Sequence, residues 1–298
     1  MTHSAMNDKT IGMTLVRVGI SLIIIKDFIL YLFSLDYLFG PHAIVPFSMY
    51  DSIMHQYHLT FLEINFNDLH EAFFYMCASL LCAILFLLGW RTFWTGMLLF
   101  LFLIILKMRN VYLLDGGDNL MQVLMPFIAI SGSLPLYNTK SSTAKSNRWY
   151  QTQQLISRLG NYGVMLEICY VYFFAFLHKI PGPLWLDGTA TYYVMRTAEF
   201  QGTPLNIWIT QSALFVKFTT YATLIWEGLF PFLIWIKGKT RYYLLSFSLL
   251  MHLGILVFMR IDNYSLVMLV SYFAFITNEE YVKLYEMLPK KLQLSIPV

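Results

Sequence analysis

The chain has 298 residues, of which 58% are hydrophobic and only 12% are charged. That charged share is about half of what a soluble domain carries, and so much apolar side chain could not be hidden from water inside one core of this size. The composition therefore excludes a soluble globule, a disordered chain, a coiled coil and a repeat solenoid. A helix that crosses a bilayer needs roughly 20 mostly apolar residues, so the composition predicts a polytopic membrane protein with short loops.

Apolar runs that alternate with polar or helix-breaking residues predict the spans. Lys26 and Asp27 interrupt the first run and no small-residue cleavage site follows it, so we expect it to remain as a helix and not to be removed as a signal peptide. The third and the last runs are short for a complete crossing. We predict an all-α integral membrane protein in which residues 1–298 form a single transmembrane domain, a polytopic bundle of about eight helices at 11–32, 69–88, 93–106, 119–136, 159–177, 211–236, 242–259 and 264–276.

The basic residues of the loops predict the orientation, because cytoplasmic loops carry an excess of Lys and Arg. With the N-terminus in the cytoplasm, five basic residues fall outside: Lys107, Arg109, Lys179, Arg196 and Arg260. Twelve fall inside: Lys9, Arg91, Lys140, Lys145, Arg148, Arg158, Lys237, Lys239, Arg241, Lys283, Lys290 and Lys291. We therefore expect both termini in the cytoplasm and the protein in a bacterial-type plasma membrane. Topology explains the basic residues, so no nucleic acid is expected as a partner beside the lipid bilayer.

The segment from His178 to Tyr193 follows an aromatic span and has the first candidate site residues, His178 and Lys179, with Trp185 close behind them. Lys179 lies at the end of a span, directly before a Pro-Gly-Pro turn. A lysine in that place is either a partly desolvated base or a snorkelling side chain at the membrane interface.

A second candidate is the turn between the third and fourth predicted spans, which follows Arg109. Its glycines could let backbone N–H groups approach an anionic ligand, with carboxylates to orient it. The same residue types also form ordinary helix N-caps. The candidate ligand-binding residues here are Arg109, Asp115, Gly116, Gly117 and Asp118.

Three further polar residues, Lys217, His252 and Arg260, belong to predicted spans or their ends. A charge in hydrocarbon costs at least about 2.5 kcal/mol, so such residues usually face a bundle interior or a wet cavity. His252 and Arg260 are eight residues apart and can share one helix face, although a membrane histidine also serves as an ordinary interhelical hydrogen-bond donor. We expect an outward-opening cavity at which these groups converge, with Trp185 at its rim: His178, Lys179, Arg109, Asp118, Lys217 and His252.

The loop at 40–68 and its flank contain possible metal ligands, among them His55, His58 and His70. Their spacing matches no HExxH or similar zinc site, so we assign no metal. The aromatic residues, 17% of the chain, could line a lipoquinone pocket, but interfacial belts and lipid-facing packing also account for them.

Across nearly its whole length the chain resembles the HTTM (horizontally transferred transmembrane domain) proteins, relatives of the vitamin K-dependent gamma-carboxylase. The order and spacing of several short pieces support this resemblance: Arg17 to Phe28, Gly40-Pro41, Leu88 to Arg91, Arg109-Asn110, Gly116 to Asp118, Lys179 with Trp185 and Gly188, Glu227 with Phe230-Pro231, and His252 to Ile255. The family includes SdpB-like proteins, which help to mature or export a small secreted toxin peptide.

The resemblance implies a multi-pass protein that acts with a small secreted peptide and a companion maturation protein. It also implies an alternative, a carboxylase-like enzyme that uses a reduced lipoquinone, in which Lys179 inherits the role of the base. At Asp118 this chain departs from the carboxylase, which has a histidine there. A third alternative, an immunity-type or lipid-binding membrane protein without catalysis, also stays open.

Overall fold

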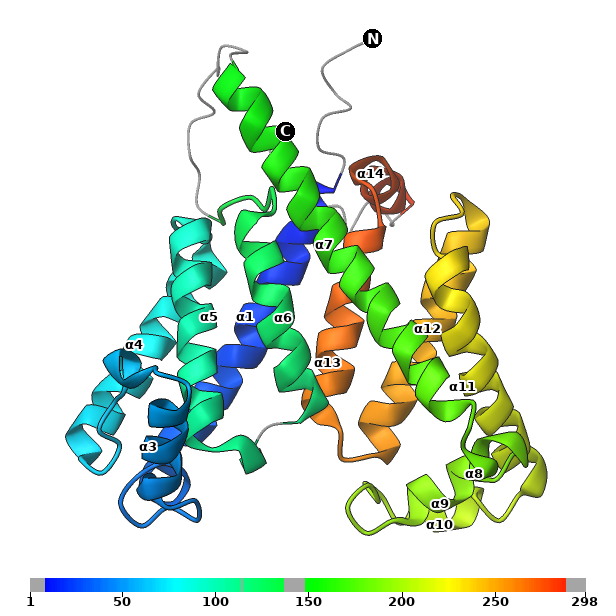
Figure 1. The fold of residues 1–298 in the computed structure, drawn as a ribbon. Helices are drawn as coiled ribbons and strands as arrows, with labels where there is room; N and C mark the ends of the chain where they lie inside the picture. The colour runs from blue at the N-terminus through cyan, green and yellow to red at the C-terminus, as the bar shows by residue number, and fades with distance from the viewer. Residues whose placement is uncertain (1–8, 114, 137–147, 288–298) are drawn as a thin grey trace. The chain divides into compact units, whose positions relative to one another are not determined.

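The computed structural model describes residues 9–113, 115–136 and 148–287, and in these ranges all regular secondary structure is helical (Figure 1). The contacts divide the chain into two compact units. Unit 1 comprises the described residues of Met1–Leu114, Gln122–Gly163 and Phe273–Val298, and unit 2 comprises Asp115–Met121 and Val164–Tyr272. Three of the four crossings between the units fall within helices, and the fourth, at 114/115, lies between two helices.

Unit 1 is built on α1 (Thr10–Phe33), which packs against α4 (Leu69–Leu88), and α4 forms a hairpin with α5 (Thr92–Arg109). The hairpin turn needs left-handed backbone: Gly89 ends α4 at φ 82 and Arg91 precedes α5 at φ 47. The other elements of unit 1 are α2 (Leu35–Leu38), α3 (Phe47–Gln56), η2 (Thr60–Leu62), η3 (Val111–Leu113), most of α6 (Gly116–Ile130), the first half of α7 (Arg148–Lys179), most of η4 (Tyr272–Phe275) and α14 (Asn278–Glu286).

Unit 2 contains the end of α7 and three long or medium helices, α11 (Ala213–Leu233), α12 (Lys239–Phe258) and α13 (Asp262–Ser271). The α12 and α13 helices pack against each other, and α11 packs against α12. Three short helices, α8 (Pro183–Leu186), α9 (Ala190–Arg196) and α10 (Leu205–Ile209), connect α7 to α11. Figure 1 shows them lying across the ends of those two helices.

The long helices are apolar on their outer as well as their inner faces, as α1 shows. Its inner face is formed by Met13, Val16, Ile20 and Ile24, at intervals of three or four residues, and all are buried. Its outer face is equally apolar, with Leu15, Leu22, Ile29, Leu30 and Phe33 exposed. Water would disfavour such an outer surface, whereas lipid would not, so this pattern is the one expected of helices in contact with a bilayer.

Among the described residues, four helices are long and apolar enough to cross a membrane: Leu69–Leu88, Thr92–Arg109, Gln151–Lys179 and Lys239–Phe258. Each of the eight predicted ranges overlaps a helix, but 119–136 extends six residues past the end of α6, and 264–276 covers the end of α13 together with η4. Four of these helices are not among the candidate spans, for identifiable reasons. Every 18-residue window of α1 contains three charged residues, and α6 and α13 have only 15 and 10 residues. The α11 helix is long enough, but its threonines, Lys217 and Glu227 lower its mean hydropathy.

Several helices differ from the predicted ranges in length. The α7 helix has 32 residues and starts about three turns before the apolar run, because its polar first turns are also helical. Sequence analysis treated the regions around α3 and α8–α10 as loops, because neither contains an apolar run of spanning length. The predicted loop residues near 140, including Lys140 and Lys145, lie outside the described residues.

Candidate functional site

Unit 2 contains a half-buried ion pair between Lys179, the last residue of α7, and Glu227 in the second half of α11. The Lys179 Nζ donates to Glu227 Oε1 at 2.5 Å and to Oε2 at 2.6 Å. The lysine side chain is 25% exposed and the glutamate side chain only 8%. The ammonium donates to both carboxylate oxygens. It therefore offsets the free-energy cost of burying the Glu227 charge in an apolar bundle.

The turn after α7 places an aromatic ring on this ion pair. Gly182 N–H donates to the Lys179 carbonyl at 2.9 Å, and Pro183 then starts α8, which carries Trp185. The Lys179 Nζ lies 5.1 Å from the centre of the Trp185 ring, within the range of a cation–π contact. Lys179 and Trp185, both predicted site residues, are therefore neighbours.

A second buried polar group lies in the same unit, around His252 on α12. His252 is 1% exposed, and its Nε2 shares a hydrogen bond of 3.2 Å with the hydroxyl of Tyr172 on α7. The Tyr172 hydroxyl also shares a hydrogen bond with that of Tyr272. The His252 Nδ1 is buried and makes no hydrogen bond within the part of the chain that the structure describes. An unsatisfied buried nitrogen is costly, about 1–3 kcal/mol, and is therefore a place where a ligand's polar group would be stabilised.

The histidine group includes a further tyrosine, Tyr264 on α13. The Tyr264 ring lies 5.5 Å from the His252 ring. We refer to the whole set as the inner polar cluster; its members are Lys179, Glu227, Trp185, Tyr172, His252, Tyr264 and Tyr272.

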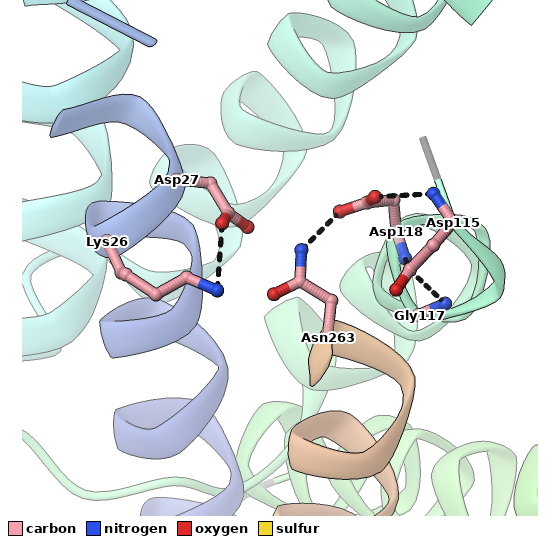
Figure 2. A network of polar contacts seen from close by, with 6 residues as sticks. All are labelled: Lys26, Asp27, Asp115, Gly117, Asp118 and Asn263. Carbon is pink, nitrogen blue, oxygen red and sulfur yellow. Dashed lines mark hydrogen bonds and ion pairs between the residues drawn. The ribbon is translucent and has the colours of Figure 1, made fainter. Parts of the chain in front are cut away.

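The Gly-Gly-Asp turn forms a helix cap in the structure (Figure 2). The Asp115 side chain accepts from the N–H groups of Gly117 (2.6 Å) and Asp118 (3.0 Å), and Asp118 accepts in return from the N–H of Asp115 (2.8 Å). Asp118 also accepts from the Asn263 side chain at 3.0 Å, which ties the start of α6 to the start of α13. Both carboxylates therefore cap the start of α6. This is the ordinary helix N-cap that the sequence offered as the alternative to a ligand site.

The two glycines of this turn differ in their surroundings. A Cβ on Gly117 would overlap the backbone of Asn263 and Tyr264, whereas a Cβ on Gly116 would meet only the Tyr264 ring, at 3.8 Å. Gly117 therefore allows α6 to approach the residue whose ring packs on His252. It is required for packing, and no open cavity adjoins it that a larger side chain could fill.

Arg109 belongs to unit 1 and is fully buried there. Its guanidinium donates to the carbonyls of Phe39 (2.9 Å), Val45 (2.8 Å) and Gly40 (3.2 Å), so it fastens the 39–45 loop to the end of α5. Burial raises the pKa of nearby Tyr50 to about 12, which keeps that phenol neutral. The Arg109 side chain is thus occupied by backbone, unlike the free ligand-binding group that the sequence analysis expected.

Three other predicted residues are exposed and do not share the burial of the inner polar cluster: His178, Lys217 and Arg260. Arg260 cannot share a helix face with His252, because α12 ends at Phe258. In unit 1 the adjacent Lys26 and Asp27 form an ion pair of 3.0 Å (Figure 2). Of the predicted site residues, unit 2 brings Lys179 and Trp185 into contact, and His252 belongs to the same unit.

Glu227, Tyr172, Tyr264 and Tyr272 are not among the site residues predicted from the sequence. A signal for Glu227 exists, because a carboxylate within an apolar run needs a cation. The tyrosines carried no such signal among the 20 tyrosines of the chain. Within the described residues, no group of three or more His, Cys, Asp or Glu side chains could hold a metal ion.

No family model, curated protein or solved structure matches the chain.

Proposed function

We propose that the protein is an eight-span membrane protein of the HTTM type that takes part in the maturation or export of a small secreted peptide. In this proposal the inner polar cluster faces the extracytoplasmic side and binds a polar part of the substrate. The observation that carries the proposal is the Lys179–Glu227 pair beneath Trp185, because a half-buried ion pair is more than packing requires. The same unit also contains the unsatisfied His252 nitrogen.

The carboxylase-like enzyme is the second candidate. It requires Lys179 to be neutral when it accepts a proton from a reduced lipoquinone. The His252 Nδ1 and the tyrosine rings would suit a flat ring with polar substituents. The Lys179 Nζ, however, already donates to both oxygens of the Glu227 carboxylate. The ion pair therefore supports binding by a charged lysine more than it supports base catalysis.

Mass spectrometry of molecules that co-purify with the detergent-solubilised protein tests the proposal. We expect a peptide to co-purify with the wild type and to be lost from the double variant Lys179→Met/Glu227→Leu, which removes both charges together. Lys217→Met, which alters an exposed lysine of the same unit, is the matched control and should retain the peptide. An isoprenoid quinone that is lost in the same variant would favour the enzyme. Ordinary phospholipid alone, bound equally by all variants, would contradict both proposals.

The proposed topology is tested by cysteine labelling in intact cells. With Cys77 replaced by serine, the two remaining cysteines are buried. We expect Ser52→Cys to react with a membrane-impermeant maleimide from outside, because Ser52 lies on the exposed loop helix α3. Glu279→Cys on α14 should react only after permeabilisation. Labelling of both positions from the same side would show that the topology is wrong.

A further inference from the structure

The α8–α10 segment of unit 2 exposes several large apolar side chains. Trp208 is 70% exposed, and Leu214, in the first turn of α11, is 81% exposed. Isolated exposed apolar residues are normal in any protein, but here large ones recur through one segment. We call this set the interfacial set; it comprises Leu186, Tyr193, Leu205, Trp208 and Leu214.

Hydrogen bonds hold the segment in place, so the exposure of Trp208 is not that of a loose loop. Asn206 is fully buried, and its side-chain amide donates to the carbonyls of Met195 (3.0 Å) and Phe258 (2.6 Å). Arg196 donates to Thr210 Oγ1 at 2.8 Å, which ties α9 to the end of α10. With α10 anchored through its inner face, its outer residues are directed away from the bundle.

The same contacts place the segment at the level where apolar helices end. Phe258 is the last residue of α12, and Lys179 is the last residue of α7; both helices are long and apolar enough to cross a membrane. The Gly202 N–H also donates to the Phe258 carbonyl at 3.0 Å. The α8–α10 layer is therefore attached to the ends of two candidate spans, where the hydrocarbon of a bilayer would give way to headgroups.

The exposed apolar surface of α11 continues from the interfacial set along the whole helix. From Leu214 onward, exposed apolar side chains follow at intervals of three or four residues, which places them on one face: Phe218, Tyr221, Ile225, Leu229 and Phe232. The Tyr221 hydroxyl donates to the Leu186 carbonyl at 2.9 Å, which joins this face to α8. A continuous apolar stripe on the exposed face of a 21-residue helix is the surface expected against lipid, and the interfacial set forms its end.

We propose that the interfacial set inserts into the headgroup–acyl boundary of the lipid bilayer, so that α8–α10 lies flat on the membrane as an anchoring layer. Trp and Tyr are enriched at this boundary because they combine an apolar ring with a polar group. Helices that lie in the interface bury their apolar side about 5–10 Å below the headgroups. The continuity with the α11 stripe identifies lipid, and not a soluble protein, as the occupant.

Spin labels in reconstituted vesicles test the depth of the segment. Leu205→Cys and Trp208→Cys are labelled in the full chain with Cys77 replaced by serine. Asp187→Cys and Glu199→Cys, exposed polar positions of the same segment, serve as matched controls. We expect oxygen, which concentrates in lipid, to be the main agent that increases the relaxation rate of the spin labels at 205 and 208. For the control labels, the main agent should be a water-soluble nickel chelate.

Two outcomes would overturn the proposal. Nickel relaxation at 205 and 208 equal to that of the controls would place the set in water, and protection from both agents would show that protein covers it. Trp208 fluorescence, taken as the difference between wild type and Trp208→Phe, gives a second readout that adds no label. Vesicles with lipids brominated near the headgroup should quench this difference signal, and an unquenched signal would also count against insertion.

Discussion

Replacing Lys179 with methionine is expected to lower the free energy of unfolding by about 3 kcal/mol, because it leaves the Glu227 carboxylate buried without its cation. Both Glu227 oxygens accept from this lysine, and the glutamate side chain is only 8% exposed, so water cannot replace the ammonium. Equilibrium unfolding in mixed micelles measures the change.

The double variant Lys179→Met/Glu227→Leu distinguishes a lost ion pair from lost packing. Apolar replacements of similar volume often stabilise a site once both charges are gone, so the double variant should be more stable than Lys179→Met alone. The coupling energy follows from the complete double-mutant cycle. Lys217→Met, at an exposed lysine, should change stability by less than about 0.5 kcal/mol. If the effects of the two single variants simply add, the ion pair contributes nothing and the proposed site loses its basis.

These variants also separate stability from function. A double variant that folds well yet loses its co-purifying peptide would show that the pair is kept for binding. Lys179→Arg should preserve the contact with Glu227, because a guanidinium stays charged and can reach both oxygens. A binding protein should therefore tolerate Lys179→Arg, whereas an enzyme with Lys179 as its base should not.

The positions of the long helices could be predicted from the sequence because membrane helices leave a simple signal. An apolar run long enough to cross a bilayer predicts a helix, because only helices and closed barrels satisfy every backbone hydrogen bond in lipid. This physical rule explains why each predicted range overlaps a helix. It carries no information on short helices such as α8, whose 4 residues are placed by turns and by contacts with α11.

The partners of the polar residues could not be predicted in the same way. Glu227 and Lys179 are 48 positions apart, and nothing local connects them. Arg109 and Asp118 looked alike as candidate ligands, yet one holds backbone carbonyls in unit 1 and the other caps a helix in unit 2. Polar residue types in a membrane chain therefore show that a partner exists, but only the packing shows which partner it is.

Replacing Arg109 with methionine is expected to lower the free energy of unfolding by at least about 3 kcal/mol, because three buried carbonyls lose their donors and each costs about 1–3 kcal/mol when unsatisfied. Phe39, Gly40 and Val45, which supply these carbonyls, are all buried. Arg109→Lys should fall between the wild type and Arg109→Met, since one compact ammonium cannot reproduce three directed bonds.

Arg260→Met is the matched control for Arg109→Met. Both arginines were candidate ligand-binding residues, but Arg260 is exposed, so its replacement should change stability by less than about 0.5 kcal/mol. Unfolding in mixed micelles again provides the measurement, and proteolysis of the 39–45 loop gives a local one, because a loop released from Arg109 should be cleaved faster. Unchanged stability together with lost ligand binding in Arg109→Met would contradict this structural role and return Arg109 to the candidate binding residues.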